Sequence, residues 1–524
     1  MRLLERAAFS AGRMAHAFTA SRIRAQATGT TAPPPAAYES AGTGRRTIGW
    51  RTSTVGPNAS TLPHLRRLRE QARDRYRNDP YGGGAIDYRT AQLVGCGIWP
   101  KSRASDKALR ARIDGLFARW STQCDADGRH DFAGLQTLVT RTWQEAGEMF
   151  VRFRPRRPED GLAVPLQLQA LEPELLPLDD ERVLSAGNQI RAGIEQNGIG
   201  RTVAYHFHPF HPGDGDSRVD VNRLVRVPAD LVAHVYLPLR AGQLRGLPHL
   251  FRTLLPLRDL DIGEDATLVR WSMANMFMGW LRKSGPGPLD TTLDPITGQP
   301  IQRDANDQAT IAMEPGAFPV LQAGEELQFN DPPEVGSNFE AFMRHVLRKV
   351  AIATGTPYHA LTGDMAQVND RTIRVILQDF RRSLEALQEQ VLVHQFCAPT
   401  WTHFFESAVL SGALEIPAAA FGDAALMADV ISVEWAPHRF AAIHPVQDVQ
   451  ADVDEIRAGL SSRTLKVQGR GYDVEEIDRQ RAEDNERDRA NGLVSDSDAS
   501  ATDGSGKRVG AVALGDQPRE EATA

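Results

Sequence analysis

The sequence predicts an α+β protein organised around long helices. Residues 338–350 and 373–392 carry apolar side chains three and four positions apart, the spacing of one apolar stripe on a helix. The connection between them contains two glycines and one proline, so a single helix cannot run through it. A third helical pattern covers residues 247–281, whereas residues 128–240 predict an α+β unit whose second half is mostly sheet.

The composition is that of an ordinary soluble globular protein, with 524 residues of which 41% are hydrophobic and 24% charged. This length predicts about three to four folding units. A net charge of −7 argues against a protein that simply coats nucleic acid by electrostatic attraction. Cys96, Cys124 and Cys397 are far apart, so we expect reduced thiols and an intracellular folding site. No run of 18 or more apolar residues occurs, and we expect no membrane-spanning helix.

The first part of the chain is basic. Residues 1–24 hold five arginines and one acid, which predicts a mobile arm in preference to a transit peptide, and residues 28–37 predict a linker. A helix is expected from Thr61, with a solvated basic face. This face consists of Arg66, Arg67, Arg69, Arg73, Arg75 and Arg77. The three glycines at positions 82–84 predict a break before the next helix.

The following unit combines helices with short strands. Helices are predicted at residues 106–120 and 132–148. Alternating apolar and polar residues predict strands at 148–154, 166–172, 190–196, 203–208 and 231–237. His206 and His208 would share one face of a strand, with His211 close behind, which is geometrically possible for zinc. Because no cysteine accompanies them, we interpret the pair as a polar sheet face and expect no metal site.

The predicted helix over residues 247–281 would be about 45 Å long at about 1.5 Å per residue. It carries an acidic group that consists of Asp259, Asp261, Glu264 and Asp265. Acids near a helix N-terminus interact favourably with the helix dipole, which is one explanation of this group. Residues 284–333 then lose the helical period, and they are too many for a plain loop, which favours a small subdomain with short strands.

The helix that begins near residue 373 is expected to continue towards Leu410, with Pro399 kinking or ending it. Further helices are predicted at residues 449–459 and 473–488. After Gly492 the chain is rich in Ser, Asp, Ala, Thr and Gly, which predicts disorder.

The sequence carries no enzyme motif. Gly504-Ser-Gly-Lys507 imitates a phosphate-binding loop, but Arg508 replaces the hydroxyl residue that would bind magnesium. A Gly-x-Ser-x-Gly elbow, a His-Glu-x-x-His helix and a paired Cys-x-x-Cys are absent from the sequence. We therefore expect no catalytic residue and no cofactor.

Three phrases of the sequence resemble those of a known family. They are Ala353-Thr-Gly-Thr-Pro-Tyr-His-Ala-Leu-Thr-Gly-Asp364, Val368-Asn-Asp-Arg371 and Val393-His-Gln-Phe-Cys-Ala-Pro-Thr-Trp401. They resemble the portal proteins of tailed phages, specifically the lambda-type family, and the resemblance extends from about residue 40 to residue 493. One departure is that Asp370 and Arg371 stand where the family usually has an aromatic and small hydroxyl residues.

The resemblance implies a portal-type fold with long stem helices, a small clip subdomain, an α/β wing and a helical C-terminal crown-like region. The implied parts are a basic arm and linker at 1–60, the wing at 61–245, the first stem helix at 246–283, the clip at 284–335, the second stem helix at 336–357, the tunnel loop at 358–371, a kinked long helix and wing return at 372–432, the crown-like region at 433–492 and a disordered tail at 493–524.

The same resemblance implies a ring of about twelve subunits at one capsid vertex, through which double-stranded DNA is packaged and ejected. The implied partners are further copies of the chain, the DNA, the terminase large subunit, neck or adaptor proteins, and the major capsid and scaffold proteins. The protein would belong to the virion, assembled in the cytoplasm of the bacterial host. Residues implied to approach DNA from the tunnel loop are Gly363, Asp364, Gln367, Asn369, Asp370 and Arg371. The acids of the 247–281 helix are candidates to line the channel, where carboxylates repel phosphates and let DNA slide. Pairing between subunits with the basic face at Arg344 and Arg348 is the alternative role for these acids.

Two alternatives remain open from the sequence. The first is a nucleic-acid enzyme of the packaging machinery, which would need a phosphate loop or a metal-binding carboxylate cluster. The second is a helical scaffold or adaptor that does not form a ring. Electron microscopy would distinguish them, since a portal forms rings with a central hole.

Overall fold

In the computed structural model, the protein is described over residues 52–184, 187–214, 223–276, 279–283, 337–366, 368–437, 445–470 and 474–493, with residues 49, 300, 302–303, 309–310, 325–329, 472 and 495. The chain divides into two units, Met1–Gly56 and Pro57–Ala524. The predicted arm at 1–24, the linker at 28–37 and almost all of the tail lie outside the described residues. Every helix in the described ranges is too short or too polar to cross a lipid bilayer.

The second unit begins with two packed helices, α2 (Pro57–Asn78) and α3 (Pro80–Val94). Asp79 caps α3 by accepting hydrogen bonds from the N–H groups of Tyr81 and Gly82. The predicted break at the three glycines is wrong, because all three lie inside α3. A Cβ atom at Gly83 would lie 2.6 Å from the carbonyl oxygen of Tyr76, so this glycine allows α3 to approach α2 closely.

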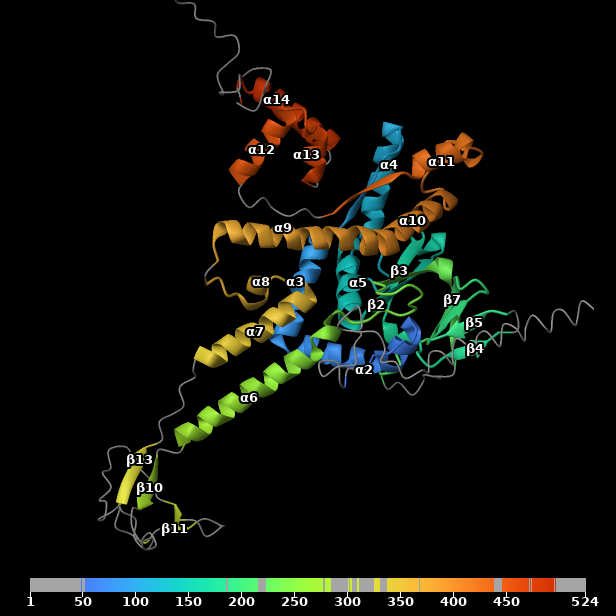
Figure 1. Cartoon of the computed structure of the whole chain (residues 1–524). Helices are drawn as coiled ribbons and strands as arrows, with labels where there is room; N and C mark the ends of the chain where they lie inside the picture. Colours follow the sequence, from blue (N-terminus) through green and yellow to red (C-terminus); the bar gives the residue numbers. More distant parts are fainter. Residues whose placement is uncertain are drawn as a thin grey trace, which may run out of the picture. The chain divides into compact units, whose positions relative to one another are not determined.

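The main core lies between helices and a three-stranded antiparallel sheet of order β3-β2-β9 (Figure 1). The strands are β2 (Glu148–Pro155), β3 (Leu166–Leu171) and β9 (Val232–Tyr236). The helices α4 (Lys107–Ser121) and α5 (Phe132–Ala146) contribute aromatic side chains, of which Phe117 contacts Trp120, Phe132, Trp401 and Phe404. The predicted helices and strands of this region are therefore confirmed within a few residues.

A five-stranded antiparallel sheet of order β4-β5-β6-β7-β8 forms a second core around Phe150 and Tyr205. Its strands are β4 (Glu181–Val183), β5 (Gln189–Arg191), β6 (Ile194–Gln196), β7 (Thr202–Phe207) and β8 (Val225–Pro228). The predicted single strand at 190–196 is a hairpin instead. Ala192 and Gly193 both have positive φ angles, 51° and 77°, which a two-residue turn between twisted strands requires.

Helix α6 (Leu254–Met276) follows a 3₁₀ turn at His249–Arg252. It has 23 residues and is therefore about 35 Å long, shorter than the predicted helix, because residues 279–283 form a strand. That strand, β10 (Gly279–Lys283), pairs antiparallel with β13 (Glu325–Phe329), and β11 (Gln302–Arg303) pairs with β12 (Ala309–Thr310). Short strands were predicted here, and most of residues 284–335 lie outside the described residues.

The chain returns through α7 (Ser337–Thr354), the short α8 (Tyr358–Thr362) and α9 (Asp370–Leu387). A π-helical segment, η6 (Gln388–Cys397), then leads into α10 (Ala398–Leu410). Pro399 does not end the helix, since it occupies the second position of α10 and Ala398 is helical. The buried side chains of Phe396 and Trp401 flank the proline, and their packing outweighs its local preference.

The last part begins with a 3₁₀ turn at Ala418–Phe421, α11 (Ala424–Ile431) and β14 (Val433–Ala436). Strand β14 pairs antiparallel with β1 (Trp99–Ser102), so residues 433–436 belong with the N-terminal part and not with a C-terminal helical region. Three helices follow, α12 (Pro445–Arg457), α13 (Arg463–Gly469) and α14 (Val474–Ala490).

Candidate functional site

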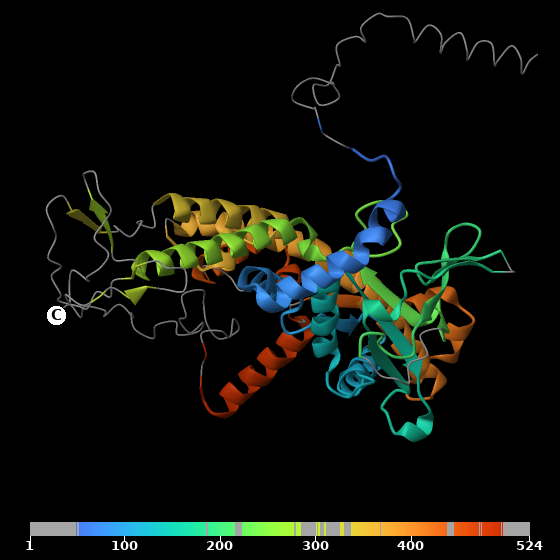
Figure 2. The same cartoon turned by 90° about the horizontal axis from the view of Figure 1, so that it is seen from below.

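Helices α6 and α7 lie side by side in both views of the molecule (Figures 1 and 2). Leu260 of α6 is buried against Val346 and Leu347 of α7, and Tyr358 of α8 packs on the same cluster. Beyond this contact the two helices leave large apolar side chains exposed. They are Leu255, Ile262, Leu268 and Val269 of α6, and Phe342 and Ile352 of α7. A helix pair with apolar side chains on further faces is typical of a protein–protein contact.

The four acids of α6 lie in its second and third turns. Because α6 begins at Leu254 and has no acid in its first turn, the helix dipole does not explain them. Asp261 accepts a hydrogen bond of 3.1 Å from Nη1 of Arg75, which joins α6 to α2. Asp259 and Asp265 are exposed, and they carry negative charge on the surface of α6.

Glu264 is only partly exposed. Burial raises its pKa above the ordinary value, and the negative charges of Asp261, Asp79 and Asp265 raise it further. Asp261 is therefore paired with an arginine, and the charged form of Glu264 is disfavoured. These two acids are the least suited to repel an anion.

The 3₁₀ turn before α6 and helix α3 are both joined to the end of α7 by partly buried hydrogen bonds. Nε2–H of His249 donates to the carbonyl oxygen of Thr354 at 2.7 Å. Nη1 of Arg89 donates to the carbonyl oxygen of Gly355 at 3.4 Å, while its Nε donates to Gln144 at 3.1 Å. Burial lowers the pKa of Arg89 to about 10. These bonds satisfy carbonyls at the C-terminus of α7, where positive charge is favoured.

The loop between α8 and α9 is held by its own polar contacts. Gly363 ends α8 in the left-handed region with φ of 70°, and Asp364 follows it. One carboxylate oxygen of Asp364 accepts from the N–H of Ala366 at 3.0 Å and the other from the hydroxyl of Tyr358 at 3.2 Å. The bond from Ala366, followed by that from Tyr358, lowers the pKa of Asp364. Asp364 therefore shapes the loop with both of its oxygens.

Asn369 begins the long helix that follows. Its Oδ1 accepts from both the N–H and the hydroxyl of Thr372 at 2.8 Å, which is the geometry of an N-cap. Arg371 is exposed in the first turn of α9. Asp370 is the first residue of α9, whereas Gln367 lies outside the described residues. Gly363 is thus a helix C-cap, Asp364 stabilises the loop and Asn369 is an N-cap. The sequence predicted only contact with DNA for these residues.

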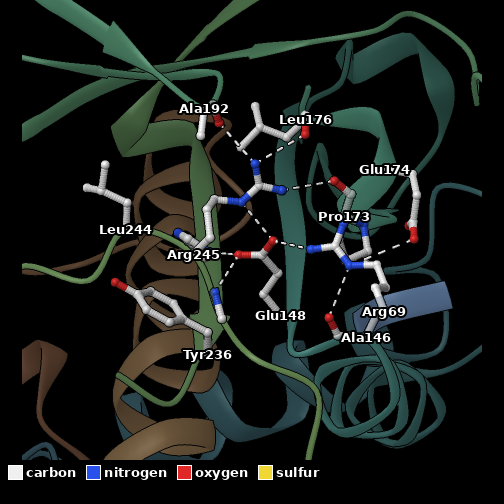
Figure 3. A network of polar contacts seen from close by, with 12 residues as sticks. Arg69, Ala146, Glu148, Pro173, Glu174, Leu176, Ala192, Tyr236, Leu244 and Arg245 are labelled. Atoms are coloured by element: carbon white, nitrogen blue, oxygen red, sulfur yellow. Dashed lines mark hydrogen bonds and ion pairs between the residues drawn. The ribbon is translucent and has the colours of Figure 1, made fainter. Parts of the chain in front are cut away.

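A buried ion network that sequence reasoning missed fixes the segment leading into α6 (Figure 3). The carboxylate of Glu148 is completely buried and accepts from Nη2 of Arg69 and Nε of Arg245, each at 2.7 Å. It also accepts from Nε2–H of His234 at 3.0 Å and from the N–H of Gly246 at 2.9 Å. Arg69 was predicted to be solvated, and this prediction is wrong because its partner Glu148 is distant in the sequence.

The guanidinium of Arg245 is also completely buried, and it donates to three carbonyl oxygens besides Glu148 (Figure 3). They are those of Ala192 at 2.9 Å, Pro173 at 3.1 Å and Leu176 at 3.2 Å. Arg245 thereby links both sheets to the chain that enters α6. No periodic pattern in the sequence signals this residue.

In the part of the chain that the structure describes, His206, His208 and His211 do not form one group of metal ligands. His206 is nearly buried, and its Nε2 lies 3.1 Å from Glu195, whose carboxylate also binds Arg226. His211 lies instead beside Glu172 and Glu174. The phosphate-loop imitation at 504–507 lies outside the described residues.

Comparison with known proteins identifies relatives over most of the chain. The model of the family described as phage portal protein, lambda family, matches residues 43–388. The probable portal protein of Halomonas phage phiHAP-1 is 25% identical over 437 residues, covering 80% of this chain and 79% of that protein. Portal protein B of Escherichia phage lambda is 21% identical over 516 residues, which cover 89% of this chain and 92% of that protein. Among solved structures, a chain from the neck of an empty gene transfer agent particle matches with a TM-score of 0.44 and 13% identity; that neck was computed with C6 symmetry. The match covers 80% of this chain and 95% of the other.

These matches define the class as a structural component of a phage head. The chain belongs to the lambda family of phage portal proteins. Portal proteins are non-enzymatic virion components at the capsid vertex, so the alternative of a packaging enzyme does not apply.

Proposed function

We propose that copies of this chain form a ring of about twelve subunits around a channel for double-stranded DNA. The observation that carries the proposal is the match to the portal family over residues 43–388. In this assembly DNA passes inward during packaging and outward during ejection. The ring docks the terminase large subunit and later the neck proteins, and it contacts the major capsid and scaffold proteins after assembly in the host cytoplasm.

The exposed apolar side chains of α6 and α7 support assembly by these helices. A neighbouring copy that covered Leu268 and Val269 would remove from water side chains that are more than half exposed in the single chain. Such a contact joins two different surfaces and is heterologous, and it closes into a ring when the rotation divides a full turn. We assign α6 and α7 to the two stem helices, and residues 284–335 to the clip.

Within the channel, we assign the phosphate-repelling role to the exposed acids Asp259 and Asp265. Asp261 and Glu264 contribute less, because the first binds Arg75 and burial raises the pKa of the second. The loop over residues 363–371 approaches DNA through its exposed groups, with Asp364 and Asn369 holding the loop in shape. Repulsion by fixed carboxylates keeps the duplex from adhering while it moves.

Native mass spectrometry and electron microscopy of the purified chain test the ring. We expect an assembly close to twelve times the 57.6 kDa chain, with a central hole. A chain that stays monomeric under all assembly conditions would refute the ring and favour the helical adaptor.

A packaging assay tests the channel assignment separately. We expect the double variant Asp259→Asn, Asp265→Asn to form rings but to package DNA more slowly, most clearly at low salt. The matched control Glu159→Gln removes an exposed acid from the β2–β3 connection and should package normally. Equal packaging rates for all three proteins at low salt would contradict the assignment.

A further inference from the structure

We propose that Glu172, Glu174 and His211 form a binding site for a divalent transition-metal cation of the Zn²⁺ class. Each of the three residues offers one donor atom, and these atoms all lie within 4.8 Å of one another. One imidazole nitrogen and two carboxylate oxygens form a donor set that suits Zn²⁺, whereas Ca²⁺ and Mg²⁺ prefer oxygen ligands alone. The site is independent of ring formation and lies outside the residues assigned to the channel.

The imidazole of His211 has the position of a ligand and not of a hydrogen-bond donor. Its Nε2 is shielded from solvent and lies 3.3 Å from a carboxylate oxygen of Glu172, yet it makes no hydrogen bond. Ligands about 2.0–2.2 Å from one tetrahedral zinc ion lie roughly 3.3–3.6 Å apart. The separation of these two atoms is therefore that of two ligands sharing one ion.

The charges around the site leave room for a cation. Arg73 contacts Glu172 at 3.3 Å and Glu174 at 3.0 Å, and Glu145 lies 3.7 Å from the same guanidinium. Burial raises the pKa of Glu145, and the charges of Glu172 and Glu174 raise it further despite Arg73. Three carboxylates thus face one arginine, which orients two of them but does not neutralise the group. Arg69, at 3.8 Å from Glu174, is engaged mainly by Glu148.

The other ring nitrogen of His211 has an acceptor within reach. A carboxylate oxygen of Asp214 lies 3.8 Å from Nδ1, which at present accepts from the exposed N–H of Gly213 at 3.1 Å. When Nε2 binds a metal, the neutral ring carries its proton on Nδ1, and Asp214 becomes the acceptor while the Gly213 N–H is hydrated. A histidine held between a metal and a carboxylate is a common arrangement in metal sites.

A bound cation would strengthen a connection that the N–H of His208 already makes by donating to the carbonyl oxygen of Leu175 at 2.7 Å. Glu172 and Glu174 lie at the end of β3 and in the 3₁₀ turn Pro173–Leu175, and His211 follows β7. The ion would therefore fasten the connection after β7 to the end of β3. The expected consequence is a rise in melting temperature on addition of metal.

Titration of the full-length chain with ZnCl₂ after chelator treatment tests the site. We expect one tight Zn²⁺ per chain, weaker binding of MgCl₂, and at least a tenfold loss of Zn²⁺ affinity in His211→Ala and Glu172→Gln. Asp214→Asn should weaken binding about tenfold, as loss of an outer carboxylate does elsewhere. His64→Ala, which removes an exposed histidine from α2, is the matched control and should bind as the unmodified chain does.

Circular dichroism confirms that each variant is folded, and electron microscopy of the same samples reports ring formation separately. Zn²⁺ binding that is absent from the unmodified chain, or equal in His211→Ala and His64→Ala, would overturn the proposal. Either outcome would leave the ring untouched.

Discussion

Glu148→Gln is the substitution whose effect follows most directly from the structure. The amide has the size of the carboxylate but no charge, so two buried guanidiniums lose their counter-charge. Its NH₂ group also faces donors, among them the N–H of Gly246. Breaking a buried ion pair by removing one partner costs about 3–5 kcal/mol. For the unit Pro57–Ala524 this corresponds to a fall of several degrees in melting temperature.

The pH dependence of this stability loss distinguishes a lost ion pair from poor packing of the glutamine side chain. Burial alone would raise the pKa of Glu148, but the charge of Arg245, the hydrogen bond from His234 and the charge of Arg69 outweigh it and hold the pKa well below its ordinary value of 4.5. A carboxyl with a depressed folded pKa contributes stability that is present above the unfolded pKa and is lost as the pH falls towards the folded pKa. The difference in melting temperature between the unmodified chain and Glu148→Gln should therefore stay constant as the pH falls from 7 towards 4.5, and it should narrow as the pH falls below 4.5.

Thermal melting followed by tryptophan fluorescence measures the effect, because Trp120 and Trp143 lie in the adjoining core. Glu181→Gln is the matched control, since Glu181 is 65% exposed and lies 3.6 Å from Arg191. A surface pair of this kind contributes at most about 1 kcal/mol. If Glu148→Gln melts within about 2 °C of this control at pH 7, the reasoning about the buried network is wrong.

Three further predictions concern the helices. Gly83→Ala should lower the melting temperature, because its Cβ would lie 2.6 Å from the carbonyl oxygen of Tyr76. In the control Gly84→Ala the Cβ meets nothing within 4 Å, and the substitution should stabilise α3 by up to about 1 kcal/mol. Equal melting temperatures of the two variants would contradict the packing argument. Asn369→Ala should cost about 1 kcal/mol in urea unfolding through loss of the N-cap, and Asn369→Asp should restore most of it, a pattern that a purely DNA-contacting Asn369 would not produce. Asp261→Asn should change stability by less than about 1 kcal/mol, since Asp261 is 57% exposed; a larger loss would mean that the contact with Arg75 is worth more than a surface pair.

The sequence predicts those helices and strands whose apolar and polar residues alternate with a clear period along one stretch of chain. Helices α4 and α5 and strand β2 follow their periodicity closely, because one face of each is apolar and buried. The pairing of β1 with β14 could not be predicted, since the partners are far apart in the chain and each has only four residues. The glycines of α3 were misread because their role is set by the neighbouring helix, which periodicity does not show.

Burial of charge was the main feature that the sequence concealed. Arg69 did carry a signal, because it lies four residues after Leu65 and three before Ala72, both buried, and thus on the apolar stripe of α2. A charged residue on such a stripe is either paired or misplaced, and only the fold reveals the pairing with Glu148. The loop predicted over residues 358–371 contains the short helix α8, and the sequence could not reveal the capping roles of Gly363 and Asn369, because these depend on where α8 ends and α9 begins.

The attachment of α6 is determined by the buried ion network around Glu148 and by the hydrogen bond from His249 to the end of α7. Gly147 and Gly246 are in contact, since a Cβ atom at Gly246 would lie 1.9 Å from the Gly147 carbonyl oxygen, and Glu148 accepts from the N–H of Gly246. Three residues later, His249 bonds the end of α7. A rotation of α6 about its base would have to break these bonds, and a polar group left without its partner costs free energy. Any movement of α6 is therefore expected beyond Asp261, after the contacts of Leu260 with α7 and of Asp261 with Arg75, and not at the attachment of the helix to the sheets.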